Sequence, residues 1–128
     1  MWLTKFLNII GSFLPPDPLA GKEEALARLN PEKIYIENVR SVLGVSQREA
    51  LDICESAVRQ GLFKRGVEVL CPDGAAAASA DVETNLPATV NCWTQEDGHY
   101  EEVVLPTAQL QKVKYYRLNE QSTAATVG

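Results

Sequence analysis

The side chains best suited to metal chemistry are two cysteines and the only histidine, all in the second half of the chain. Cys71 and Cys92 supply thiols, and His99 follows shortly after Cys92. Zinc prefers such ligands, and Asp73 or Asp97 offers a fourth, but a closed structural site usually has four Cys or His ligands. We therefore interpret these residues as two buried strand cysteines and a hairpin histidine, and we expect no metal and no cofactor.

The residues around His99 form no pattern typical of an enzyme. No serine or cysteine is paired with His99 in a recognisable nucleophile motif. The sequence also has no glycine-rich phosphate loop. The acidic pairs Glu96-Asp97 and Glu101-Glu102 are most simply solvated charges of a hairpin. We expect a protein that is not an enzyme.

The cysteine count bears on the cellular compartment. Cys54 falls on the apolar face of a predicted helix and is expected in the core. An odd total of three cysteines, with no secretory signal, favours a reducing cytosol over a disulfide framework. We expect a cytoplasmic protein whose thiols stay reduced.

Charge is distributed unevenly along the 128 residues, a length that supports one compact domain with appendages. Residues 22–70 contain eight basic and eight acidic side chains, and the net charge of −5 arises entirely after Leu70. Nonspecific DNA affinity depends on a cationic surface that neutralises phosphates. The charge pattern therefore argues against a nucleic-acid partner.

The first 14 residues are predicted to form an amphipathic helix, and residues 15–21 a Pro-rich spacer. The apolar stripe of this helix has three possible targets: the chain's own core, a partner protein or second copy, or a membrane interface. The polar face has a single cation, Lys5, which disfavours the membrane. The spacer favours an external target, so we expect the stripe to bind a protein partner through Trp2, Phe6, Leu7, Ile10 and Phe13.

The most specific local pattern lies between two predicted helices, at residues 37–43 and from residue 47 to Gly61. Gly44 stands where a helix needs a left-handed terminating residue. Ser46 and Glu49 then form an S-x-x-E capping box. Two helices joined by such a turn make a helix-turn-helix. A short helix at 22–29 precedes it, residues 33–36 are either a brief strand or a lead-in, and a strand through Val67, Val69 and Cys71 follows.

Beyond Pro72 the pattern becomes that of a β structure. Residues 74–80 are expected to be a loop or a short helix. Residues 88–95 and 99–105 are predicted strands, joined by the Asp97-Gly98 turn, and residues 113–118 are a closing strand. Residues 119–128 are expected to be a disordered tail. The predicted domain thus covers residues 22–118, with an extended wing at 71–118.

The run from Val42 to Ala50, VLGVSQREA, continuing to Arg59-Gln60-Gly61-Leu62-Phe63, resembles winged helix-turn-helix domains of bacteria. The resemblance covers about 50 residues, from about Lys22 to Pro72. The stretches Cys71-Pro72-Asp73-Gly74 and Cys92-Trp93-Thr94-Gln95 resemble a zinc ribbon in which Gly74 and Gln95 replace the second cysteine of each knuckle. Wings of this kind are similar to those of small accessory components of bacterial multi-gene systems, including defence systems.

The sequence therefore predicts an α+β fold: a winged helix-turn-helix with an elaborated antiparallel β wing and an N-terminal amphipathic helix. The resemblance implies either a non-catalytic adaptor that binds protein partners or a small DNA-binding regulator. Asp52 and Glu55 are expected on the outer face of the second motif helix, where they would repel phosphates, so we favour the adaptor. It would bind its partners through the N-terminal stripe, the acidic wing, or both, and an exposed aromatic patch from Trp2 or Trp93 would support it. A DNA-binding alternative would use Gln47, Arg48, Arg59, Lys64 and Arg65.

Overall fold

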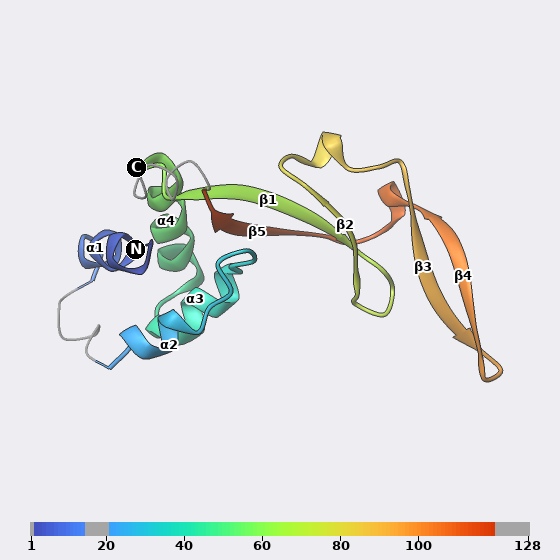
Figure 1. Ribbon diagram of the computed structural model, residues 1–128, viewed down its shortest axis with the longest axis horizontal. Coiled ribbons are helices and arrows are strands. Elements are labelled where there is room, and N and C mark those ends of the chain that lie inside the picture. The colour runs from blue at the N-terminus through green and yellow to red at the C-terminus, as the bar shows by residue number, and fades with distance from the viewer. Residues whose placement is uncertain (1, 15–20, 120–128) are drawn as a thin grey trace. The chain divides into compact units, whose positions relative to one another are not determined.

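The protein is α+β, with four α-helices and two small antiparallel sheets among the residues that the structure, a computed structural model, describes (Figure 1). Those residues are 2–14 and 21–119. The predicted spacer, except Gly21, and the predicted tail, except Asn119, lie outside them. The described residues divide into two compact units: a helical unit of residues 2–14, 21–64 and 115–119, and a β unit of residues 65–114.

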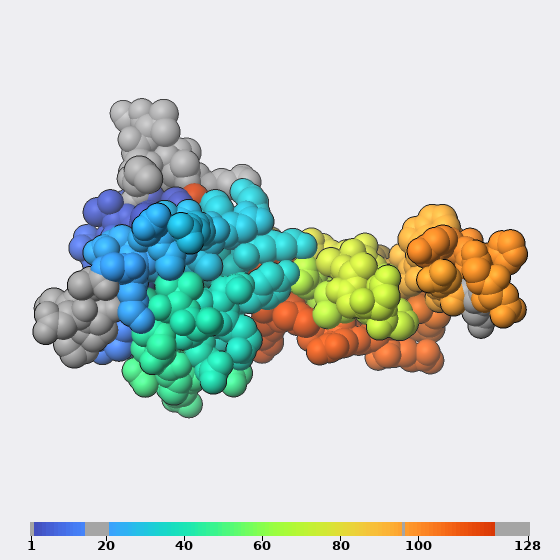
Figure 2. Space-filling view, turned by 90° about the horizontal axis from the view of Figure 1, so that it is seen from below, coloured from blue at the N-terminus to red at the C-terminus, as the bar shows by residue number. Residues whose placement is uncertain are grey.

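The helical unit has helices where the sequence predicts them, each with an apolar side turned inward. The helices are α1 (Trp2–Gly11), α2 (Glu23–Ala27), α3 (Ile36–Leu43) and α4 (Gln47–Arg59). In the space-filling view the atoms of α2 to α4, blue to green, form one closely packed surface (Figure 2). None of the described helices is long and apolar enough to cross a membrane.

The turn between α3 and α4 confirms the predicted signals. Gly44 has a φ of +67° and donates its backbone N–H to the Arg40 carbonyl. Glycine adopts this left-handed conformation without a Cβ clash. Ser46 Oγ accepts a hydrogen bond from the Glu49 backbone N–H at 3.1 Å, and the same hydroxyl donates to the Glu49 carboxylate. The capping therefore fixes where α4 begins.

Three strands make the larger sheet, in the order β2-β1-β5: β1 (Phe63–Leu70), β2 (Ala76–Ala80) and β5 (Lys112–Leu118). The expectation of a loop or short helix at 74–80 is wrong, because β2 pairs along β1 from Val67↔Ala80 to Leu70↔Ala76. Cys71 lies just beyond β1 rather than within it. Residues 33–35 are the lead-in to α3, which begins at Ile36, and Ile34 forms only an isolated antiparallel bridge to Tyr116 instead of a strand.

The second sheet is the predicted hairpin of β3 (Thr89–Glu96) and β4 (His99–Pro106). Asp97 and Gly98 both have positive φ, at 51° and 82°. Two successive positive φ values are what a tight two-residue hairpin turn needs. The turn sets the register, in which Glu96 stands opposite His99 and Trp93 opposite Glu102.

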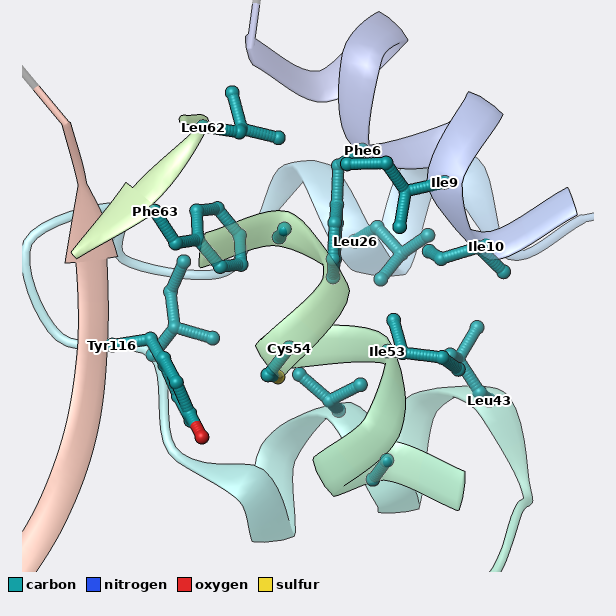
Figure 3. Close-up of a cluster of buried hydrophobic side chains, with 14 residues drawn as sticks. Phe6, Ile9, Ile10, Leu26, Leu43, Ile53, Cys54, Leu62, Phe63 and Tyr116 are labelled. Carbon is teal, nitrogen blue, oxygen red and sulfur yellow. The ribbon is translucent and has the colours of Figure 1, made fainter. Parts of the chain in front are cut away.

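The core of the helical unit includes the N-terminal helix (Figure 3). Phe6 and Ile10 are completely buried and Ile9 nearly so. The rings of Phe6 and Phe63 lie 4.9 Å apart between centroids, and Trp2 is 6.3 Å from Phe63. The hydrophobic stripe of α1 is therefore a structural part of this core.

This packing corrects the expectation that Trp2, Phe6, Leu7, Ile10 and Phe13 bind an external partner. Phe6 and Ile10 are fully covered, and Trp2 and Leu7 are half-buried against the same core. Only Phe13 is exposed, at 41%. The hydrophobic stripe of α1 is buried against the chain's own core, because α4 and the start of β1 present apolar side chains to it.

Replacing Phe6 by alanine tests this packing. We expect a loss of about 3–5 kcal/mol in the free energy of unfolding, because a buried aromatic ring is removed from the core. Urea denaturation followed by circular dichroism measures it. The control is Lys5→Ala, at an exposed position of the same helix, with an expected change below about 0.5 kcal/mol. A Phe6→Ala protein as stable as the control would show that α1 does not belong to the core.

Candidate functional site

Cys71 and Cys92 are brought together as a disulfide, with a Cα–Cα distance of 5.7 Å. The expectation of two reduced strand cysteines is therefore wrong, and with it the argument for a reducing compartment. Both residues are buried, in a small cluster with Val69 and Val90. The resemblance to a zinc ribbon grouped these two cysteines, which are 21 residues apart in the sequence, but as the remains of a metal site and not as a disulfide.

The other residues considered as metal ligands do not gather around these sulfurs. His99 is exposed at the start of β4, beside the turn that contains Asp97. Asp73 lies in the turn after Cys71, where its carboxylate accepts the Ala75 backbone N–H at 3.0 Å. Within residues 2–14 and 21–119, no group of three or more His, Cys, Asp or Glu side chains is arranged to hold a metal ion.

Cys54 belongs to the core of the helical unit, as predicted, and is completely buried. Burial raises the pKa of its thiol from 9.0 to about 12, and the neighbouring charge of Glu55 adds to the effect. The reactive thiolate is therefore scarce at neutral pH. Cys54 has the properties of a packing residue.

The outer face of α4 carries the residues of the DNA-binding alternative. Gln47, Arg48 and Arg59 are exposed there. Arg48 forms an ion pair with Asp52 at 3.4 Å, so an acidic group accompanies that cation. Glu55, which we expected to point outward, is instead half-buried, and its carboxylate accepts the Tyr116 hydroxyl at 2.6 Å.

The remaining cations of this alternative, Lys64 and Arg65, are exposed in β1. Elsewhere in the helical unit, Arg28 is paired with Glu24 and Arg40 with Glu37. Surface pairs of this kind add little stability, but each places a negative charge beside a positive one. Among the candidate residues, Arg48 is thus paired with an acidic side chain, and Lys64 and Arg65 lie on β1 and not on α4.

The β3–β4 hairpin has one covered face and one open face. The covered face contributes Val90 and Cys92 to the small buried cluster, and Val103 and Leu105 pack against it. Side chains alternate between the two faces of a strand. We call the open side the Trp93 face; it consists of Asn91, Trp93, Gln95, Tyr100, Glu102 and Val104.

Large hydrophobic side chains are concentrated on the Trp93 face. Trp93 is 57% exposed, Tyr100 72% and Val104 64%, and these are three of the five exposed large hydrophobic residues in the described chain. Trp93 stands directly opposite Glu102, and Tyr100 and Val104 lie two residues to either side of Glu102. Such diagonal neighbours are within reach of aromatic side chains. The three apolar groups therefore form one patch.

The hairpin that presents this patch is acidic. Residues 89–106 contain four carboxylate residues and no lysine or arginine. The sequence interpretation named the acidic wing as a possible binding surface and Trp93 as a possible exposed aromatic residue, but it did not identify which side chains share a face of the hairpin. The alternation of side chains between the two faces, counted outward from the Asp97-Gly98 turn, could have shown which residues lie together, because the turn sets the register of the two strands.

Comparisons with protein-family models, with curated protein sequences and with solved structures found no significant match to this chain.

Thiol counting tests the disulfide and the burial of Cys54 together. In air-oxidised, folded protein we expect no thiol to react with DTNB, because Cys71 and Cys92 are bonded and Cys54 is buried. In guanidinium chloride without reductant one thiol should react, and after reduction all three. The Cys54→Ala variant should show none before reduction. Three reactive thiols in the unreduced, denatured protein would contradict the disulfide.

Proposed function

We propose that this protein is a non-catalytic protein-interaction module, an adaptor or assembly subunit of a bacterial multi-component system, built on a winged helix-turn-helix. The observation that carries the proposal is the Trp93 face, an exposed apolar patch on an acidic hairpin whose opposite face is covered. No catalytic step is part of the proposal. The cytoplasmic location stays a prediction, and the disulfide weighs against it.

The order of elements supports the winged-helix part of the proposal. Helix α2 is followed by the bridging residue Ile34, then by α3, the Gly44 turn, α4 and strand β1. Strand β5 closes the unit by pairing with β1 and by bridging Ile34 through Tyr116. A helix, a short strand, two helices joined by a tight turn and a returning strand pair make up a winged helix. Strands β2, β3 and β4 would then be insertions that enlarge its wing.

The composition of the Trp93 face supports an interaction role. Exposed apolar patches on soluble proteins often mark binding surfaces, and tryptophan and tyrosine dominate the energetics of protein interfaces. Here both residue types stand on a sheet face whose backbone is fixed by strand pairing, so little conformational entropy is lost when a partner binds. A polar rim is provided by Asn91 and Gln95.

The DNA-binding alternative has weaker support. Recognition helices place basic and amide side chains on bases and phosphates. On α4 the candidate Arg48 is paired with Asp52, and Glu49 is exposed at the same end of the helix. Specific and nonspecific DNA binding both require a net cationic contact surface. The charges of α4 favour a scaffold helix over a recognition helix.

Removing the two aromatic rings tests the proposed interaction role. In affinity capture from the native host, the Trp93→Ser/Tyr100→Ser protein should recover its specific partner at least about tenfold less well than the unaltered chain, because two interface anchors are lost. The matched control is Val82→Ser, another exposed apolar residue at 51%. It should capture the partner normally. Circular dichroism checks that all three proteins fold alike.

Two results would contradict the proposal. One is a set of captured proteins that is the same for the double variant and the unaltered chain. The other is a tight, salt-sensitive complex with random duplex DNA that Arg48→Ala and Arg59→Ala weaken while Trp93→Ser does not. That second result would establish the DNA-binding alternative.

A further inference from the structure

A carboxylate stands in the middle of the apolar patch. Glu102 lies directly across the hairpin from Trp93 and between Tyr100 and Val104 on its own strand. It is exposed, and no ion pair joins it to any side chain that the structure describes. A partner that covers Trp93 and Tyr100 must therefore also cover Glu102.

Covering Glu102 has an electrostatic consequence. A carboxylate that loses its water without gaining a partner strongly opposes binding, whereas one that meets a cation is compensated by a charge-assisted hydrogen bond. Within residues 89–106 the chain supplies no lysine or arginine for this purpose. Because no described lysine or arginine elsewhere in the chain forms an ion pair with Glu102 either, we expect the compensating cation to come from the bound molecule.

The neighbouring ring selects the kind of cation. Tryptophan binds cations over its face more strongly than the other aromatic residues do. Arginine can stack its planar guanidinium on such a ring and direct paired N–H groups to a carboxylate, whereas the lysine ammonium is a strongly hydrated point charge. A ring and a carboxylate on directly opposed strand positions, as Trp93 and Glu102 are, suit the guanidinium best.

The charge of the whole hairpin indicates which residues should flank that arginine in the partner. Four carboxylate residues and no lysine or arginine in 89–106 attract a cationic segment at long range and repel an acidic one. A second copy of this chain would bring the same negative hairpin against the first. The favoured occupant is a basic segment of a different protein.

We propose that the Trp93 face is a receptor for an arginine side chain in a basic segment of a partner protein, with the guanidinium between the Trp93 ring and the Glu102 carboxylate. This proposal rests on the interaction function proposed above and specifies the chemistry of its partner. Tyr100 and Val104 contact the apolar side chains that flank the arginine.

Direct titration tests the receptor. The probe is a capped, extended peptide of alternating arginine and threonine, added to full-length, oxidised, ¹⁵N-labelled protein at physiological ionic strength. We expect a saturable shift of the Trp93 indole N–H resonance with little change in that of Trp2, which lies in the helical unit. The same peptide with lysine should bind several-fold more weakly, and the uncharged citrulline peptide should not bind.

Two neighbouring glutamates give a matched pair of variants. Glu102→Gln should weaken binding of the arginine peptide by about tenfold, because a charge-assisted hydrogen bond is lost. Glu101→Gln removes the same charge one residue away, on the opposite side of the strand, and should change the affinity by less than about twofold, since exposed charges are screened by salt.

The outcomes separate this inference from the proposed function. Equal binding of the arginine, lysine and citrulline peptides, equal effects of Glu101→Gln and Glu102→Gln, or no binding at all would overturn the arginine receptor. Concentration-dependent self-association that Trp93→Ser abolishes would also overturn it. If the arginine inference fails while the Trp93→Ser/Tyr100→Ser protein still loses its host partner, the interaction function stands and only the chemistry of the partner is wrong.

Discussion

The disulfide between Cys71 and Cys92 is the constraint that determines which face of the β3–β4 hairpin is covered and which is exposed. It links the end of β1 to the middle of β3, so the Cys92 side of the hairpin faces the buried cluster. Because strand side chains alternate, covering Cys92 turns Trp93 outward. The cluster itself has only four buried residues, including both cysteines. A disulfide between residues 21 positions apart adds about 3 kcal/mol to the free energy of unfolding, because it restricts the unfolded chain. This contribution is large compared with what so small a core can supply.

The helical unit is held together differently. Its core is a continuous apolar cluster in which Phe6 of α1 packs on Phe63 at the start of β1, and Cys54 is one of the packed side chains. The capped turn at Gly44 and Ser46 sets the angle between α3 and α4. Three ion pairs in this unit join residues on successive turns of a single helix: Arg28 with Glu24, Arg40 with Glu37, and Arg48 with Asp52. The outer face of α4 therefore carries two cations, Arg48 and Arg59, and two carboxylates, Glu49 and Asp52.

The parts of this fold that could be predicted are those encoded by local chemistry. Gly44 and the Ser46 cap marked a helix boundary, and Asp97-Gly98 marked a hairpin, because few residue types adopt a positive φ easily or can cap a helix with their side chain. Strand β2 was missed because alanine has a low strand preference, and its conformation results from pairing with β1.

The features that could not be predicted depend on contacts between distant segments. An amphipathic stripe shows that α1 must be covered, but only the packed core shows that Phe63 and its neighbours cover it. The Cys71–Cys92 bond likewise depends on such a contact, because the resemblance to a zinc ribbon grouped the two cysteines without showing that they are bonded. The Trp93 face falls between these cases. Its composition follows from period-two alternation on either side of the turn, but its exposure follows from the packing of the opposite face.

The central claim is that Trp93 is displayed to solvent beside carboxylates, and fluorescence quenching of a single tryptophan tests it most directly. Replacing Trp2 by phenylalanine leaves Trp93 as the sole tryptophan of the chain. We expect acrylamide to quench the emission of Trp93 efficiently. We also expect the ratio of caesium quenching to iodide quenching to be higher for Trp93 than for free N-acetyltryptophanamide, because the surrounding carboxylates attract cations. Emission shielded from all three quenchers, or quenched preferentially by iodide, would contradict the account.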